Sequence, residues 1–329
     1  MKVLVFGKTR NVARLIEDPV EDFRLAGHTV EVFPYRGTKL RKTLEPLLMS
    51  PILGVPLAAM LARRIRRFAP DLLLGFGPFH WLPPAIFEAI AAMPDRPPMA
   101  AWIGDSFTPD AAAAAKLFDV VAYTDTGLLA SHRTLGCAAP GAFVPLAATR
   151  GGPPPPASPK ARAKLLAFVA SASAGRRALL GEIQAPVALF GPDWRDPDGL
   201  PQHQRDPRRV DGTGLVDIYR SHFGVLNIRN ERNVVNGLNQ RHFAPYIQAT
   251  PVISDAQADL GQCFEPGTEI LTYRDSAELN DIYGALRRDP ARANAIGLAG
   301  QRRVLAHHTY AHRLETLAAL AGVKPQRTS

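Results

Sequence analysis

The chain has 329 residues, 46% of them hydrophobic and 21% charged, and a formal net charge of +9. This hydrophobic content excludes a disordered chain, and the length suffices for two domains that each bury a core. The two cysteines, Cys137 and Cys263, lie far apart, which excludes a disulfide framework or a cysteine metal cluster and favours a reducing cytoplasm. The amino terminus has the pattern of a strand rather than that of a signal peptide.

Strands and helices alternate along the first 149 residues. Short apolar runs that end at a glycine or a polar residue are typical of buried parallel strands, and the segments between them repeat apolar residues at helical spacing. We expect strands at 2–6, 29–33, 71–74, 99–103, 120–123 and 144–146. We expect helices at 11–26, 57–68, 84–92, 110–117 and 126–135. This alternation predicts a parallel sheet with right-handed crossovers.

Within this half, residues 44–62 are mostly apolar and lead into the basic cluster at 63–67. Three prolines and Glu45 interrupt the apolar stretch, which argues against a membrane span. An apolar segment joined to a basic one can lie on an anionic membrane surface, so 44–67 is a candidate for peripheral contact with the inner membrane face. The favoured interpretation is a core helix with a solvated basic end. A basic stripe with interleaved aromatics is absent, so no nucleic-acid partner is expected.

The stretch 150–156 is the clearest linker, because two glycines and four prolines follow Arg150. Consecutive prolines favour an extended polyproline conformation and do not continue a helix or a sheet. We therefore expect an N-terminal domain at 1–149, a linker at 150–160, a second domain at 161–308 and a terminal helix within 309–329.

The second half repeats the alternation of strands and helices. We expect strands at 165–169, 187–190, 224–228, 251–254 and 270–273. We expect helices at 176–182, 214–221, 237–248, 276–287, 290–306 and 309–321. Two similar halves predict an α/β fold of two Rossmann-like domains that face a central cleft, with ligands bound outside the carboxyl ends of the strands.

Several motifs occur in a family-specific order. They are G-L-N-Q-R-H-F (237–243), T-P-V-I-S-D (250–255), F-E-P-G-T-E-I-L-T-Y (264–273) and H-T-Y-A-H-R (308–313). In these motifs, and more weakly upstream in W-I-G-D (102–105), the chain resembles the CgeB-like, spore-maturation-type glycosyltransferases. The resemblance implies the GT-B fold, in which the terminal helix crosses back to the N-terminal domain. It also implies transfer of a sugar, of the hexosyltransferase type, from a nucleotide-sugar to a protein, glycan or small-molecule acceptor.

A departing nucleotide diphosphate carries negative charge, which arginine forks and helix N-termini can stabilise where no metal is bound. We expect no metal cofactor, because we single out no metal-binding acidic cluster. Strand-end positions, the small-residue loop 171–175 and the resemblance together give the candidate donor-binding residues. They are Ser171, Arg176, Arg177, Asn227, Arg229, Asn239, Arg241, Glu265, Gly267 and Glu269. For the arginines the alternative is a solvated surface position, and for the loop and the Pro-Gly turn it is tight-turn packing.

The sequence does not reveal whether transfer is retaining or inverting. Inverting transfer needs a carboxylate or histidine base that faces the acceptor, because the base takes a proton from the acceptor hydroxyl. Asp105 ends a predicted strand in the N-terminal domain and is the first candidate, with helix capping as the alternative. His80, after another predicted strand, is the second. His307, His308 and His312 have metal-like spacing, but structural packing is the favoured interpretation because no acidic partners accompany them.

One position departs from the family pattern. The family has glutamate directly after R-x-F, where related enzymes bind the donor ribose, and this chain has Ala244. This departure leaves the identity of the nucleotide-sugar donor undetermined. It also supports an alternative function, that of an inactive nucleotide-sugar-binding or scaffold protein. A nucleotide-sugar epimerase is a further alternative, because the same fold also supports such enzymes.

Overall fold

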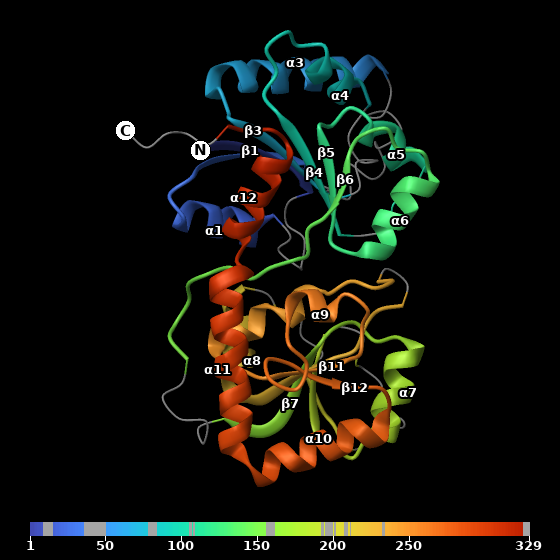
Figure 1. Cartoon of the computed structure of the whole chain (residues 1–329), viewed down its shortest axis with the longest axis vertical. Coiled ribbons are helices and arrows are strands. Elements are labelled where there is room, and N and C mark those ends of the chain that lie inside the picture. The colour runs from blue at the N-terminus through green and yellow to red at the C-terminus, as the bar shows by residue number, and fades with distance from the viewer. Residues whose placement is uncertain are drawn as a thin grey trace. The chain divides into compact units, whose positions relative to one another are not determined.

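The chain folds into two compact units, one of Met1–Pro145 with Tyr310–Ser329 and one of Leu146–Thr309. The computed structural model describes residues 1–8, 16–35, 51–77, 84–104, 107, 109–155, 162–191, 194, 200, 202–206, 210, 212–231 and 234–324. Figure 1 shows both units, with the colour running from blue at the N-terminus to red at the C-terminus. The first segment of the first unit ends at Pro145, ahead of the predicted linker at 150–160.

The first unit is a six-stranded parallel sheet in the order β2-β1-β3-β4-β5-β6. Its strands are β1 (Lys2–Lys8), β2 (Thr29–Tyr35), β3 (Leu72–Phe76), β4 (Met99–Ile103), β5 (Val120–Tyr123) and β6 (Gly141–Phe143). Its helices are α1 (Glu17–Leu25), α3 (Pro51–Phe68), α4 (Pro84–Ala91), α5 (Pro109–Ala115), α6 (Thr126–Thr134) and α12 (Tyr310–Leu320). β4 and β5 are buried along their whole length, because central parallel strands are covered on both faces.

The terminal helix α12 belongs to this first unit, although it follows the second unit in the sequence. The Ala311 N–H donates to Oδ2 of Asp22 on α1 (2.7 Å), and Nε of Arg313 donates to the Pro145 carbonyl (2.7 Å). The ring of Tyr310 meets that of Trp102 on β4 edge-on. The predicted return of the terminal helix to the N-terminal domain is therefore confirmed.

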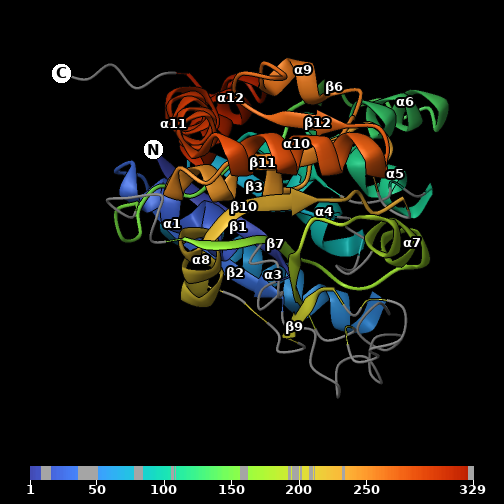
Figure 2. The ribbon, with the colours of Figure 1, turned by 90° about the horizontal axis from the view of Figure 1, so that it is seen from below.

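The second unit is also a six-stranded parallel sheet, in the order β12-β11-β10-β7-β8-β9. Its strands are β7 (Ala163–Val169), β8 (Val187–Phe190), β9 (Gln204–Asp206), β10 (His222–Asn227), β11 (Val252–Asp255) and β12 (Leu271–Tyr273). Its α-helices are α7 (Ala174–Glu182), α8 (Gly212–Ser221), α9 (Leu260–Cys263), α10 (Ser276–Arg288) and α11 (Pro290–His307). Figure 2 shows this sheet running from β12 towards β9.

The predicted helix at 237–248 is wrong in type. Two short 3-10 helices occupy the segment, η3 (Gln240–His242) and η4 (Ala244–Gln248). Pro245 lacks an N–H for helical bonding, and Ala249 ends the segment in the left-handed conformation. Gly300 of α11 explains the close packing here, because a Cβ on it would lie 2.1 Å from the Tyr246 ring.

Other differences fall at element ends and edges. The predicted strand at 144–146 is wrong, because β6 ends at Phe143. The predicted helix at 11–26 lies partly outside the described residues, and α1 begins at Glu17. The sequence did not predict β9 or α9; β9 is a polar edge strand with no apolar run to mark it.

Helix α3 extends the predicted helix at 57–68 back to Pro51. Its inner face, with Ala58, Leu61 and Ile65, is buried in the core of the first unit. Among the helices that the structure describes, none combines the length and apolar character that a bilayer crossing requires.

Candidate functional site

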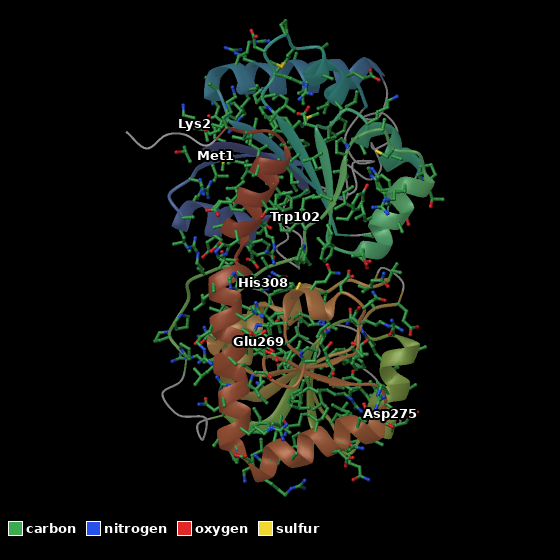
Figure 3. The ribbon with its side chains drawn as sticks, in the orientation of Figure 1. Met1, Lys2, Trp102, Glu269, Asp275 and His308 are labelled. Atoms are coloured by element: carbon green, nitrogen blue, oxygen red, sulfur yellow. The ribbon has the colours of Figure 1, made fainter. Side chains whose placement is uncertain are left out.

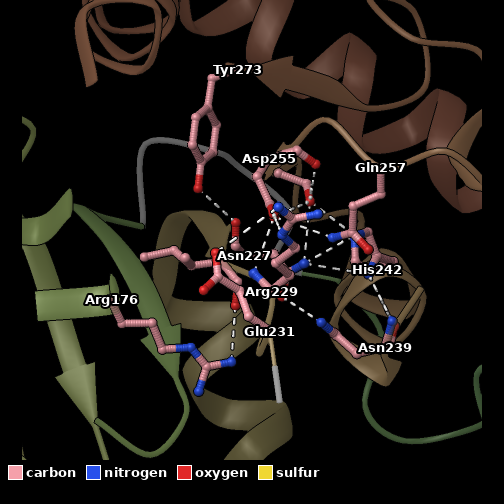
Figure 4. Close-up of polar contacts among 11 residues, drawn as sticks. Arg176, Asn227, Arg229, Glu231, Asn239, His242, Asp255, Gln257 and Tyr273 are labelled. Atoms are coloured by element: carbon pink, nitrogen blue, oxygen red, sulfur yellow. Dashed lines mark hydrogen bonds and ion pairs between the residues drawn. The ribbon is translucent and has the colours of Figure 1, made fainter. Parts of the chain in front are cut away.

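Polar side chains from several elements gather at the carboxyl edge of the second sheet (Figure 4). β10 ends at Asn227 and β11 ends at Ser254 and Asp255, while Arg176 comes from the helix that follows β7. The carboxyl edge of a parallel sheet is the usual ligand position in this kind of fold. We call these residues, together with Arg229, Asn239, Arg241 and His242, the Asn227 cluster.

Asn227 is the centre of the cluster and is fully buried. Its Oδ1 accepts hydrogen bonds from Nε of Arg241 and from Nδ2 of Asn239, each at 3.0 Å. Its Nδ2 donates to Oγ of Ser254 (3.2 Å), and its carbonyl accepts from the Tyr273 hydroxyl (3.0 Å). The side chain is thus committed to hydrogen bonds with other residues of the cluster.

Arg241 presents free hydrogen-bond donors at this edge. Asn239 caps η3 and accepts from the Arg241 N–H (2.9 Å), while Asn227 fixes the guanidinium through Nε. No described residue accepts a hydrogen bond from Nη1 or Nη2 of Arg241. Burial lowers the pKa of this arginine, so its charged form is incompletely solvated. A fixed guanidinium with two open nitrogens suits a bidentate oxyanion such as phosphate.

Arg176 is 3% exposed and ties two strand ends together. It donates from Nη1 to the Ser171 carbonyl and from Nη2 to the Ile228 carbonyl, each at 2.9 Å. Burial, with Arg241 as a second cause, lowers the pKa of Arg176 to about 10, which leaves it charged at neutral pH. Arg176 therefore adds positive charge to the edge and holds the predicted loop at Ser171.

Asp255 and Arg229 form a partly buried acid–base pair. The Arg229 N–H donates to Oδ1 of Asp255 (3.2 Å), and Nε of Arg229 lies 3.7 Å from Oδ2. Gln257 also donates to this carboxylate (3.2 Å), and burial raises the pKa of Asp255. Two acids, the partly buried Asp255 and the exposed Glu231, thus accompany Arg176, Arg229 and Arg241, so the edge has a net positive charge that favours an anionic ligand.

His242 is a buried residue that the sequence did not single out. Its Nε2 lies 2.9 Å from Oγ of Ser254 and 2.9 Å from Nδ2 of Asn227, and its Nδ1 accepts from the Asn239 N–H (3.1 Å). Burial lowers the pKa of His242 to about 3, so it is neutral at physiological pH. Two features of the sequence could have pointed to His242 and its neighbours. His242 lies inside the motif G-L-N-Q-R-H-F, and Ser254 and Asp255 lie at the end of a predicted strand.

The predicted site residues at 265–269 lie in a turn before β12. Of these residues, Glu269 is labelled in Figure 3. Gly267 has φ +83°, which favours glycine. Nε of Arg303 donates to both oxygens of Glu269 (2.8 and 3.0 Å), and Oε2 also accepts from the Glu265 N–H (2.8 Å). None of the described contacts of these three residues involves the Asn227 cluster.

The other residues that the sequence analysis singled out do not belong to the Asn227 cluster. The Arg177 guanidinium lies over the Trp194 ring, 5.3 Å from its centroid. Nε2 of the buried His308 lies 2.9 Å from the Cys263 carbonyl oxygen. Asp105 and His80 lie outside the described residues. Across the described part of the chain, no group of acidic, histidine and cysteine side chains could hold a metal ion.

Comparison with known proteins gives a family match over part of the chain. Residues 166–319 match the family model described as "Glycosyl transferase-like". This span contains the whole Asn227 cluster. A search of curated proteins finds no sequence match.

Solved structures match over nearly the whole chain. Sucrose-phosphate synthase from Thermosynechococcus elongatus has a TM-score of 0.66 at 14% identity, covering 96% of this chain and 97% of its own. HepE from Anabaena, solved with UDP-glucose, has a TM-score of 0.64 at 14% identity, with coverages of 98% and 100%. A glycosyltransferase from Rickettsia africae has a TM-score of 0.65 at 9% identity, with coverages of 100% and 99%. The chain therefore has the two-domain Rossmann-like fold of the GT-B glycosyltransferases, and its second half matches the glycosyl transferase-like family.

Proposed function

We propose that this protein is a glycosyltransferase that moves a sugar from a nucleotide-sugar to a hydroxyl of a protein, glycan or small molecule. The observation that carries the proposal is the Arg241 guanidinium, which Asn227 fixes through Nε and which keeps two open nitrogens at the carboxyl edge of the sheet. The family match over 166–319 and the UDP-glucose bound to Anabaena HepE support it.

The Asn227 cluster would bind the donor diphosphate. As the glycosidic bond to the diphosphate breaks, negative charge develops on the leaving oxygen, and the three arginines stabilise it without a metal. Arg241 supplies the direct contact, whereas Arg176 and Arg229 act through their charge. In this proposal Asp105 or His80 of the N-terminal domain takes the proton of the acceptor hydroxyl.

The proposal also includes a family subtype, a type of donor sugar and a cellular location. The motif order at 237–273 favours the CgeB-like subtype and a hexosyl donor. Neither Cys137 nor Cys263 forms a disulfide, which supports a place in the cytoplasm.

Donor binding is the direct test. Thermal shift against UDP, GDP, CMP and dTDP sugars should give stabilisation by one donor class, because a ligand that binds only the folded state raises Tm. Calorimetry with that donor should then show Arg241→Ala weakening binding by at least ~1 kcal/mol. Arg288→Ala, at an exposed position at the end of α10, is the matched control and should bind as wild type does. No shift with any donor would refute the proposal.

Ala244 favours a second candidate, a nucleotide-sugar-binding protein that has lost catalysis. The residue begins η4 and offers no carboxylate to the ribose. Incubation with the identified donor separates the candidates. Transfer or hydrolysis supports the transferase, binding without turnover supports the binding protein, and conversion of the donor sugar without acceptor supports an epimerase.

A further inference from the structure

The outer face of α3 combines exposed arginines with an exposed methionine. Arg63, Arg66 and Arg67 are exposed, and Met60 is 62% exposed. The opposite face is buried in the core of the first unit through Leu61 and Ile65. The helix is therefore anchored by one face, and its other face is available to a partner.

The three exposed arginines lack partners in the part of the chain that the structure describes. The neighbouring Arg64 differs, because its Nε donates to Oε2 of Glu31 at 2.7 Å. The sequence of α3 contains no acidic residue, and α4, which packs beside it, contributes the single acid Glu88. The outer face of α3 thus has excess positive charge within two turns.

The sequence concentrates its charge in the same region. Residues 36–67 contain eight arginines and lysines against the single acid Glu45, a net +7 out of the chain total of +9. The positive charge is therefore concentrated in this segment rather than spread over the chain. Concentrated cationic charge beside exposed apolar side chains suits an anionic interface.

We propose that the outer face of α3 docks on a membrane surface that contains anionic lipids. Arg63, Arg66 and Arg67 contact the lipid phosphates, and Met60 enters the boundary between headgroups and acyl chains. A nucleic acid is the weaker fit, because single-stranded binding uses stacking aromatics and no described side chain on this face is an exposed aromatic. The proposal does not depend on glycosyl transfer and would hold for a protein without turnover.

Vesicle co-sedimentation of the full chain tests the proposal. We compare phosphatidylcholine vesicles with vesicles that also contain phosphatidylglycerol, at low and high salt. Wild type should bind only the anionic vesicles, and less at high salt. A basic side chain near an anionic surface strengthens partitioning by about fivefold, so Arg63→Gln/Arg66→Gln/Arg67→Gln should weaken it by roughly a hundredfold.

The matched control removes three exposed arginines of the second unit, Arg288→Gln/Arg292→Gln/Arg302→Gln, and so lowers the net charge equally. It should bind the anionic vesicles almost as wild type does. Far-UV circular dichroism and Tm verify that both triple variants fold, and Met60→Gln serves as a milder second variant that should also weaken binding. Three outcomes overturn the proposal: no binding of wild type to anionic vesicles, equal loss in the control, or binding to nucleic acid but not to vesicles.

Discussion

At the scale of single residues, Asn227 determines how Arg241 is presented. Its Oδ1 accepts from both Arg241 and Asn239, so its removal frees the guanidinium and leaves buried donors unpaired. We predict that Asn227→Ala weakens donor binding nearly as much as Arg241→Ala does. The double variant should bind like either single variant, because the two substitutions remove the same contact.

Calorimetry on the two single variants and the double variant measures this coupling, and urea unfolding reports the accompanying loss of stability. Ser221→Ala is a control on an exposed helix end outside the cluster and should leave donor affinity unchanged. Additive losses of donor affinity would mean that Asn227 contacts the donor itself.

His242 makes the stability of the protein depend on pH. Its pKa is about 3 in the folded protein and about 6.5 in the unfolded chain, so below pH 6.5 the unfolded state binds the proton first. The free energy of unfolding should fall as the pH drops from 6.5 towards 3, and His242 contributes about 2 kcal/mol of this loss at pH 5.

Urea unfolding at pH 7 and pH 5 tests the assignment. His242→Gln removes the titrating ring, so its stability should change less between the two pH values than that of wild type. His307→Gln, at an exposed position on α11, is the matched control and should retain the wild-type pH dependence. Equal pH dependence in wild type and His242→Gln would contradict the prediction.

At the scale of elements, Glu269 joins the turn before β12 to α11. Its side chain is 15% exposed, and its carboxylate accepts hydrogen bonds from Arg303 and from the Glu265 N–H. We predict that Glu269→Gln lowers the free energy of unfolding by about 1–3 kcal/mol, because Arg303 loses its charged partner. Donor affinity should stay unchanged, in contrast to the role that the family resemblance implies for Glu269.

Chemical unfolding and calorimetry on the same preparation separate the two roles. Glu265→Gln changes the same charge on an exposed side chain of the same turn and should alter neither quantity. Weaker donor binding with unchanged stability in Glu269→Gln would place this carboxylate at the donor after all.

The sequence predicted best those strands that form an uninterrupted apolar run. β4 and β8 are uniformly apolar, because they are buried on both faces, and their ends were predicted to the residue. The segment 237–248 has helical spacing, but the tertiary packing around Tyr246 and Pro245 imposes 3-10 turns instead. β9 is held by pairing with β8, which leaves no hydrophobic pattern in its own sequence.

The candidate site likewise contains residues that the sequence predicted and residues whose roles depend on tertiary contacts. Strand-end position pointed to Arg229, because the carboxyl edge of a parallel sheet follows from the alternation alone. Arg241 was predicted from the motif that resembles the family and from its place after a predicted helix start. Spacing does not reveal which polar residues bind each other, so the supporting role of Asn227 and the presence of His242 became apparent only in the structure. The pairing of Glu269 with Arg303 joins residues from separate elements, which no local pattern encodes.

At the scale of the whole molecule, α12 makes the first unit depend on the end of the chain. Leu314 and Leu317 are fully buried, and α12 packs on α1, β4 and β5. Leu314→Ala should therefore lower the free energy of unfolding by about 2–5 kcal/mol. Leu320→Ala makes the same change at a position that is 45% exposed, and should cost no more than about 0.5 kcal/mol.

Hydrogen exchange localises the effect of Leu314→Ala within the chain. The amides of α1, β4 and β5 should exchange faster, although these elements lie far from residue 314 in the sequence. The amides of β10 and β11 should exchange as in wild type, because those strands belong to the other unit. Faster exchange confined to the second unit would show that α12 supports that unit, and faster exchange throughout would show that the two units unfold together.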